Sequence, residues 1–99
     1  MLVVDQVISL IYFIHQNNIV HLDTHTNNFL VDTDFYVKII DFGEYKEDTD
    51  IEYRKTDYKR FIRDITTWIN EGGYINLEYL LNYINNPYGI IRYLFTNAK

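Results

Sequence analysis

The stretch that decides the fold runs from Ile19 to Gly43 and reads Ile19-Val-His-Leu-Asp-Thr-His-Thr-Asn-Asn-Phe-Leu-Val-Asp-Thr-Asp-Phe-Tyr-Val-Lys-Ile-Ile-Asp-Phe-Gly43. Side chains that can act on phosphate or metal occur at both of its ends, and an apolar segment lies between them. The pattern His-x-Asp-x-x-x-x-Asn comes first and a triplet closes the stretch; the residues concerned are His21, Asp23, Asn28, Asp41, Phe42 and Gly43.

The apolar middle of this stretch predicts a β-hairpin over residues 29–40. Residues 29–31 and 36–40 are rich in β-branched and aromatic side chains, and Asp32-Thr33-Asp34 between them is typical of a turn. Because a hairpin brings its two ends together, we expect Asp23, Asn28 and Asp41 to converge on one surface cleft.

The two motifs resemble the catalytic loop and the Asp-Phe-Gly triplet of the protein-kinase-like superfamily, in the family's order and spacing. The segment from Tyr12 to His21 is also similar to the helix end that precedes the family's catalytic loop. One residue departs from His-Arg-Asp, because Leu22 replaces the arginine. The resemblance covers the C-terminal lobe only. It implies a mainly α fold with a small β-hairpin and with the N-terminal lobe absent.

The same resemblance implies roles for the polar residues. Asp23 is the expected catalytic base, which accepts or orients the proton of the acceptor hydroxyl. Asn28 and Asp41 are the expected ligands of the Mg²⁺ that accompanies ATP, and Leu30 is the expected apolar floor of the adenine site. His25, two residues after the base, would face the transferring phosphate. The simpler alternatives are a solvated loop acid for Asp23 and turn residues for Asn28 and Asp41.

Further residues have expected structural roles. By resemblance, His21 packs against Phe42 of the triplet that Gly43 completes, and Asp57 is a buried acid that opens the central helix and accepts backbone hydrogen bonds from the catalytic loop. Asp64 is the other candidate for that acid. An arginine at position 22 grips a phosphorylated activation loop in the family, and Leu22 cannot, so we do not expect regulation by that route.

A zinc site is the rival interpretation of the first motif. On an extended strand, His21, Asp23 and His25 would lie on one face and could bind zinc together. That interpretation leaves Asn28 and the Asp-Phe-Gly triplet unexplained.

The rest of the chain predicts helices and one loop, in a single partial kinase-like domain over residues 1–99. Apolar residues at spacings of three and four predict a buried helix over Leu2–Gln16, which Asn17-Asn18 ends. The charged residues 44–56 predict a short activation-like loop. Helices follow over residues 57–96: an amphipathic helix from Asp57 to Gly72-Gly73, a helix from Leu77 to Ile84 capped by Asn76, and a last segment, Tyr88 to Thr96, after Pro87.

Composition excludes several classes of protein. The net charge of −5 and the absence of a basic cluster argue against nucleic acid and against an anionic membrane as partner. The chain has no cysteine, and its apolar start is too short to span a bilayer. We therefore expect a soluble, intracellular protein.

The expected function is ATP-dependent phosphoryl transfer, as a catalytic-lobe fragment of a Ser/Thr-type protein kinase. In the family the Gly-rich phosphate loop, the strand lysine and its helix glutamate lie upstream, and these 99 residues contain none of them. We therefore expect little activity from the chain alone, and a missing N-terminal lobe or partner chain. One alternative is a small-molecule kinase of the aminoglycoside-phosphotransferase type, which His25 and the missing Ala-Pro-Glu favour. The other is a non-catalytic remnant that serves as a binding module.

Overall fold

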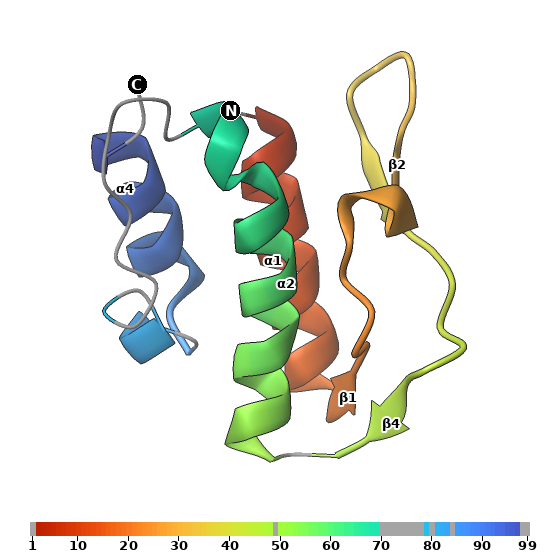
Figure 1. The fold of residues 1–99 in the computed structure, drawn as a ribbon. Helices are drawn as coiled ribbons and strands as arrows, with labels where there is room; N and C mark the ends of the chain where they lie inside the picture. Colours follow the sequence, from red (N-terminus) through yellow and green to blue (C-terminus); the bar gives the residue numbers. More distant parts are fainter. Residues whose placement is uncertain (1, 49, 70–78, 80, 84, 98–99) are drawn as a thin grey trace.

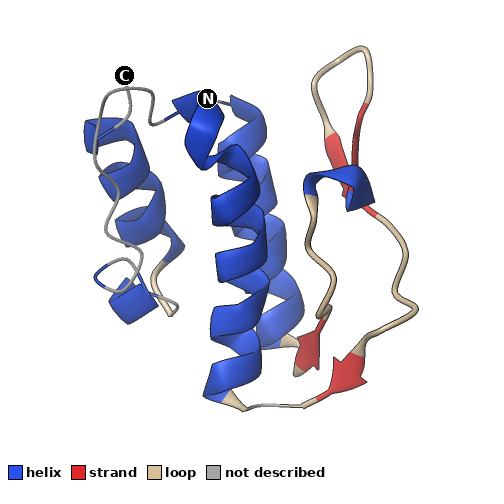
Figure 2. Ribbon diagram, viewed as in Figure 1, coloured by secondary structure: helices blue, strands red, loops and turns tan. Residues whose placement is uncertain are grey.

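The computed structural model describes residues 2–48, 50–69, 79, 81–83 and 85–97. Three α-helices dominate these residues, and two small antiparallel sheets accompany them (Figures 1 and 2). The elements are α1 (Leu2–Gln16), β1 (Ile19–Val20), η1 (Thr26–Asn28), β2 (Phe29–Val31), β3 (Val37–Ile39), β4 (Lys46–Glu47), α2 (Ile51–Ile69), η2 (Leu81–Tyr83) and α4 (Pro87–Asn97). Figure 1 shows α1 and α2 side by side, with α4 on one side of the pair and the strands on the other.

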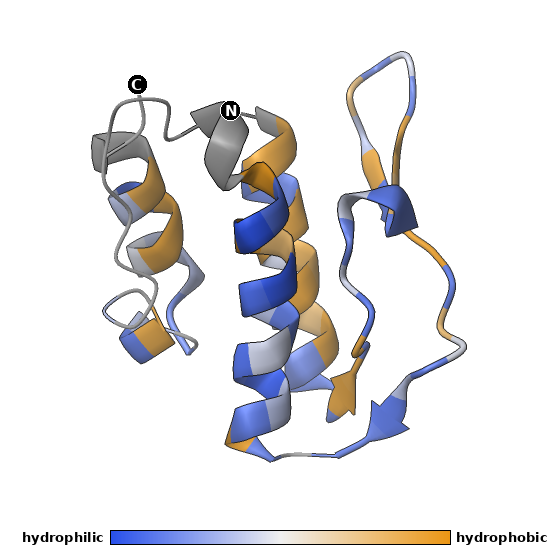
Figure 3. Cartoon of the chain, in the orientation of Figure 1, coloured by the Kyte–Doolittle hydropathy of each residue, from blue (hydrophilic) through white to orange (hydrophobic). Residues whose placement is uncertain are grey.

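Helix α1 is the buried centre of the fold, as its sequence predicts. Val7, Ile8 and Ile11 are at most 1% exposed, because helical spacing places them on one stripe of α1. That stripe packs against the apolar faces of α2 and α4, whose buried members are Tyr58, Phe61, Ile62, Ile65, Ile90 and Leu94. Figure 3 shows the contrast between the apolar α1 and the polar outer face of α2.

The end of α1 confirms the role predicted for its two asparagines. The helix ends at Gln16, and Asn18 takes a left-handed backbone conformation with φ of 60°. The amides of Asn17 and Asn18 donate to the carbonyls of Ile14 and His15, which are among the last carbonyls of the helix. The chain can therefore turn directly into β1.

The predicted hairpin is confirmed. Strands β2 and β3 pair antiparallel, with Leu30 opposite Lys38. The Asp32 carboxylate accepts hydrogen bonds from the amides of Asp34 and Tyr36, which is the turn chemistry that the sequence indicated. A second pairing was not predicted: β1 lies antiparallel to β4, with Ile19 opposite Glu47.

The predicted start of the central helix was wrong. Helix α2 begins at Ile51, six residues before Asp57, and this shortens the loop expected over residues 44–56. The reason is capping: the Asp50 carboxylate accepts a hydrogen bond from the amide of Glu52 at 2.7 Å, and Glu52 adds negative charge to the first turn. Asp57 consequently lies within α2 and does not open it.

The predictions for the following segment fall mostly outside the described residues. These are the helix end at Gly72-Gly73, the cap at Asn76 and much of the helix from Leu77 to Ile84. The described part of that segment includes the short η2 helix. Helix α4 begins at Pro87 itself, one residue earlier than expected, where a proline has the backbone conformation that a first helical residue needs. Within the described part of the chain, no helix is long and apolar enough to cross a membrane.

Tyr58 predicts a loss of stability in alkaline solution. Its side chain is fully buried, and burial, followed by the nearby Asp57 carboxylate, raises the pKa of Tyr58 above the usual value of 10.0. Below pH 10 the phenol is neutral in both the folded and the unfolded chain. Above pH 10 only the unfolded chain releases the proton, so the free energy of unfolding should fall, by at most about 1.4 kcal/mol per pH unit from this group.

Urea unfolding at pH 8 and pH 11 measures this effect. Tyr58→Phe should reduce the difference between the two pH values, whatever it does to stability at pH 8. Tyr88→Phe is the matched control, because Tyr88 is 81% exposed. An equal loss in the wild type and in Tyr58→Phe would show that Tyr58 is not responsible.

Candidate functional site

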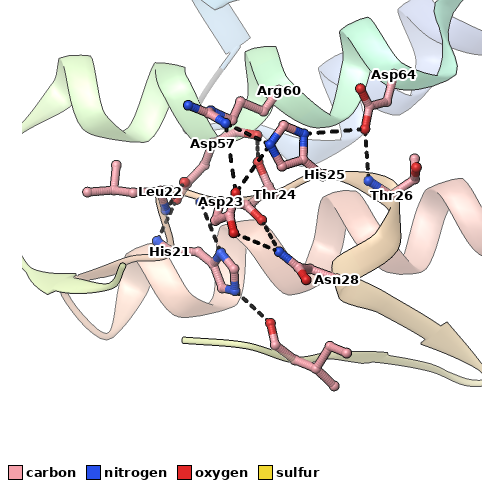
Figure 4. A network of polar contacts seen from close by, with 11 residues as sticks. His21, Leu22, Asp23, Thr24, His25, Thr26, Asn28, Asp57, Arg60 and Asp64 are labelled. Atoms are coloured by element: carbon pink, nitrogen blue, oxygen red, sulfur yellow. Dashed lines mark hydrogen bonds and ion pairs between the residues drawn. The ribbon is translucent and has the colours of Figure 1, made fainter. Parts of the chain in front are cut away.

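The polar loop, residues 21–28, is fixed to α2 by Asp57. The Asp57 side chain is fully buried, and its two oxygens accept backbone hydrogen bonds from His21 at 3.0 Å and from Leu22 at 2.7 Å (Figure 4). The backbone carbonyl of Asp57 accepts a third bond, from the Thr24 hydroxyl. One helical residue therefore holds three positions of the loop, His21 and Leu22 before Asp23 and Thr24 directly after it.

His15 supports Asp57 from α1, and the sequence analysis missed it. Its ring is buried, and its Nε2 lies 2.8 Å from a carboxylate oxygen of Asp57. The signal was in the pattern, because His15 lies on the same stripe of α1 as Ile8 and Ile11. A polar ring among buried residues needs a hydrogen-bond partner.

Leu22 adopts a backbone conformation that a bulky residue rarely takes, with φ of 66°. The surrounding hydrogen bonds hold this strained conformation in place, since Asp57 binds the amides of both His21 and Leu22. The backbone turn at Leu22 then directs the following residue, Asp23, toward Asn28.

His21 connects the polar loop to the end of the hairpin. Its Nδ1 accepts a hydrogen bond from the Asp23 amide at 3.1 Å, so its Nε2 carries the proton and donates to the carbonyl of Ile40 at 2.8 Å. The ring lies edge-on to Phe42, with 4.7 Å between centroids. Both ring nitrogens are therefore engaged within the protein.

The zinc alternative gains no support from this arrangement. A ligand histidine needs a ring nitrogen directed at the metal, and His21 directs neither outward. In the part of the chain that the structure describes, no group of three or more His, Cys, Asp or Glu side chains could hold a metal ion.

Asp23 and Asn28 are in direct contact. The Asn28 amide nitrogen donates to the Asp23 carboxylate at 3.1 Å and to the Asp23 backbone carbonyl at 2.6 Å. Asp41 is brought near by the backbone, because the amide of Ile40 donates to the carbonyl of Asn28 at 2.8 Å. The exposed Asp41 carboxylate accepts a hydrogen bond from the Gly43 amide. The structure thus joins Asp23 to Asn28 and places the backbone of Asp41 beside them.

A cluster of polar and charged side chains lies on the α2 side of Asp23. His25 Nε2 is 3.2 Å from Asp23 Oδ1, and its Nδ1 is 3.7 Å from Asp64 Oδ2. Arg60, which the sequence analysis missed, extends from α2 to within 2.8 Å of His25 Nε2. Asp64 also accepts a hydrogen bond from the amide of Thr26 at 2.9 Å. These contacts attach the second half of the polar loop to α2.

Leu30 lies apart from this cluster, on β2, and is 52% exposed. Three other apolar side chains of the hairpin are exposed as well; they are Val31, Phe35 and Tyr36.

The chain belongs to the protein kinase domain family. The model of that family matches residues 2–64, which is more than half of the chain and includes α1, the polar loop, the hairpin and Asp57.

Curated relatives match shorter segments. A protein of Dictyostelium discoideum named as a probable serine/threonine-protein kinase is 43% identical over 35 residues, which are 35% of this chain and 7% of that protein. A second protein of that organism with the same description is 58% identical over 31 residues, 31% of this chain and 2% of that protein. The chain thus spans a small fraction of the length of these relatives. No solved structure matches the chain.

Proposed function

We propose that this chain is a segment of a kinase catalytic (C-terminal) lobe, and that it takes part in ATP-dependent phosphoryl transfer to a serine or threonine hydroxyl. The observation that carries the proposal is the contact between Asn28 and the Asp23 carboxylate on a loop whose backbone Asp57 fixes. Transfer of a phosphoryl group depends mainly on positioning. A strained loop that several hydrogen bonds hold in place can position one carboxylate.

Asp23 is the proposed base. The acceptor oxygen forms a bond to the γ-phosphorus while the bond from that phosphorus to the ADP oxygen breaks, and ADP leaves with the electron pair. The proton of the acceptor hydroxyl passes to the Asp23 carboxylate. The Asp23 side chain is 30% exposed, so a hydroxyl in solution can reach it.

ATP and Mg²⁺ are the cofactors that the proposal requires, and the donor types fit them. The Asn28 amide nitrogen is directed at Asp23, which turns the carbonyl oxygen of the same amide away from that carboxylate (Figure 4). Asp41 supplies an exposed carboxylate, and the residue before it, Ile40, is hydrogen-bonded to the backbone carbonyl of Asn28. Mg²⁺ in kinases is held by one or two such oxygens together with water and phosphate, and it neutralises phosphate charge. Leu30 would contact the adenine.

The exposed hairpin supports a partner requirement. Several apolar side chains of the hairpin are exposed, Leu30 among them, and exposed apolar surface on a small protein commonly marks an interface. We propose that an N-terminal lobe, from the same polypeptide or from a partner chain, covers this surface and supplies the phosphate loop and the lysine. The test is complementation of the 99-residue chain with a kinase N-terminal lobe.

The lobe should be added both in trans and as a fusion, with radiolabelled ATP, Mg²⁺ and a mixture of serine- and threonine-containing peptides. The chain alone should bind ATP no more tightly than millimolar and transfer no label, whereas the complemented chain should label peptide. Leu30→Asp should weaken complementation in trans, and Glu52→Gln, a change on the exposed start of α2, should not. Absence of transfer in the fusion, with nucleotide bound, would count against the proposed function and favour a non-catalytic binding module.

A small-molecule kinase is the second candidate. Two observations favour it: His25 contacts Asp23, and α2 begins only eight residues after Gly43, which leaves little chain for a surface that binds peptide. The same assay decides, with aminoglycosides and other small hydroxyl compounds offered beside the peptides. Labelling of a small molecule without labelling of peptide would replace the first candidate by the second.

A further inference from the structure

The side chain of Arg60 extends from α2 to the proposed base, Asp23. It lies on α2, one turn after Asp57, and its side chain crosses to the polar loop (Figure 4). Its Nη1 is 2.8 Å from His25 Nε2 and 3.8 Å from Asp23 Oδ1. The Asp57 anchor and the Arg60 contact therefore come from the same helix, which fixes the arginine relative to the base.

The two oxygens of the Asp23 carboxylate have different surroundings. Oδ2 accepts the hydrogen bond from Asn28, whereas Oδ1 faces His25 and Arg60. Both contacts of Arg60 use Nη1, and a guanidinium carries five N–H donors in a planar fork that matches phosphate oxygens. The Arg60 side chain is 42% exposed, so the fork is accessible beside Asp23.

Charge explains why a cation is needed at this place. The chain has a net charge of −5, and the carboxylates of Asp23 and Asp64 both lie against His25. A phosphoryl group approaching Asp23 would be repelled by these carboxylates unless a positive charge is present next to them.

Arg60 supplies that charge, because its guanidinium is always protonated. An arginine is always protonated and only donates, so the 2.8 Å contact requires Nε2 of His25 to accept. His25 therefore orients the guanidinium, and Arg60 is the cation beside the base.

We propose that Arg60 binds the oxygens of the phosphoryl group that is transferred, while Asp23 receives the proton. This inference rests on the proposed function and adds a residue that the motif pattern of the sequence does not contain. It assigns His25 to positioning Arg60.

The first test is phosphate binding by the 99-residue chain, which requires no transfer. Titration with inorganic phosphate, against sodium chloride at equal ionic strength, should shift the NMR signals of the Arg60 side chain and of the His25 ring. Arg60→Gln should abolish the His25 shift, and Arg60→Lys should keep part of it. Arg63→Gln is the matched control, since Arg63 is an exposed arginine one turn further along α2. Circular dichroism checks that each variant is folded.

The second test is transfer by the chain completed with an N-terminal lobe. Removing one charged group that stabilises the transferring phosphoryl typically costs about 100- to 1,000-fold in kcat. We expect a loss of that order in Arg60→Gln, a smaller loss in Arg60→Lys, and a rate within about twofold of wild type in Arg63→Gln. Arg60→Gln should lower kcat far more than it raises the KM for the acceptor.

The outcomes separate the two ideas. If the completed wild-type protein transfers no phosphate, the proposed function fails, and the phosphate titration still decides whether Arg60 binds the anion. No phosphate-specific shift in the wild type, an unchanged His25 shift in Arg60→Gln, or wild-type kcat in Arg60→Gln would each overturn the inference.

Discussion

Replacing Asp57 by alanine should remove a large part of the stability of the domain. The Asp57 carboxylate is fully buried, binds the amides of His21 and Leu22, and lies 2.8 Å from the buried ring of His15. Alanine would leave these donors without an acceptor in the protein interior. Removing one partner of a buried, hydrogen-bonded charged pair costs about 3–5 kcal/mol. This is a large part of the roughly 5–15 kcal/mol by which a typical domain is stable.

Asp57→Asn separates the charge from the shape. Its side chain has the same outline but only one acceptor oxygen, so its NH₂ group would face a donor, either the His21 or the Leu22 amide. We expect an intermediate loss and a polar loop that no longer holds Leu22 at positive φ. Urea unfolding followed by circular dichroism measures the first effect, and the amide NMR signals of residues 21–24 measure the second.

Glu52→Gln is the control for a lost carboxylate on the same helix. Glu52 is 71% exposed and pairs with Lys55 at 3.5 Å, so its loss should change the free energy of unfolding by less than about 0.5 kcal/mol. A change of under 1 kcal/mol in Asp57→Ala would mean that the loop is held by other contacts.

The elements that the sequence predicted well are those with local signals. The stripe of apolar residues in α1, the two asparagines after it and the Asp32 turn all act over a few neighbouring residues. Each is recorded in the spacing of the sequence, so the helix, its end and the hairpin could be predicted without the structure.

The start of α2 shows where local patterns mislead. Half of residues 51–56 are charged and the segment carries little apolar periodicity, which favoured a loop. The helix forms because Asp50 caps it, and because its later turns bury Tyr58, Phe61 and Ile65 and so stabilise the polar first turn. Packing of the later turns thus overrides the weak signal of the first.

The contacts of His15 and Arg60 join residues that are far apart in the sequence. His15 meets Asp57 across 42 residues, and Arg60 meets His25 across 35. The motif spacing placed Asp23 and Asn28 in one loop, but it contains no information on which side chains of α2 reach that loop. The His15 contact follows from the packing of α2 against α1 and the Arg60 contact from the packing of α2 against the polar loop, which only the structure provides.

Replacing Asp23 by alanine should abolish phosphoryl transfer in the lobe-completed protein and leave the fold intact. General-base catalysis contributes about 100- to 10,000-fold, and Asp23→Ala removes the group that would take the hydroxyl proton. The Asp23 side chain is 30% exposed, and the loop is anchored through backbone amides that the substitution does not alter. We therefore expect a loss in kcat with little change in nucleotide binding.

Asp34→Ala is the matched control for Asp23→Ala, because Asp34 is an exposed aspartate in the turn of the hairpin, away from the polar loop. It should transfer at the wild-type rate. Asp23→Asn adds a further comparison: it keeps an oxygen that Asn28 can bind but cannot accept the proton, so it should be as slow as Asp23→Ala if proton transfer is the role of this residue. Wild-type kcat in Asp23→Ala would exclude Asp23 as the base. A slow Asp23→Ala beside a fast Asp23→Asn would instead assign Asp23 to the positioning of Asn28, since only the hydrogen bond distinguishes the two variants.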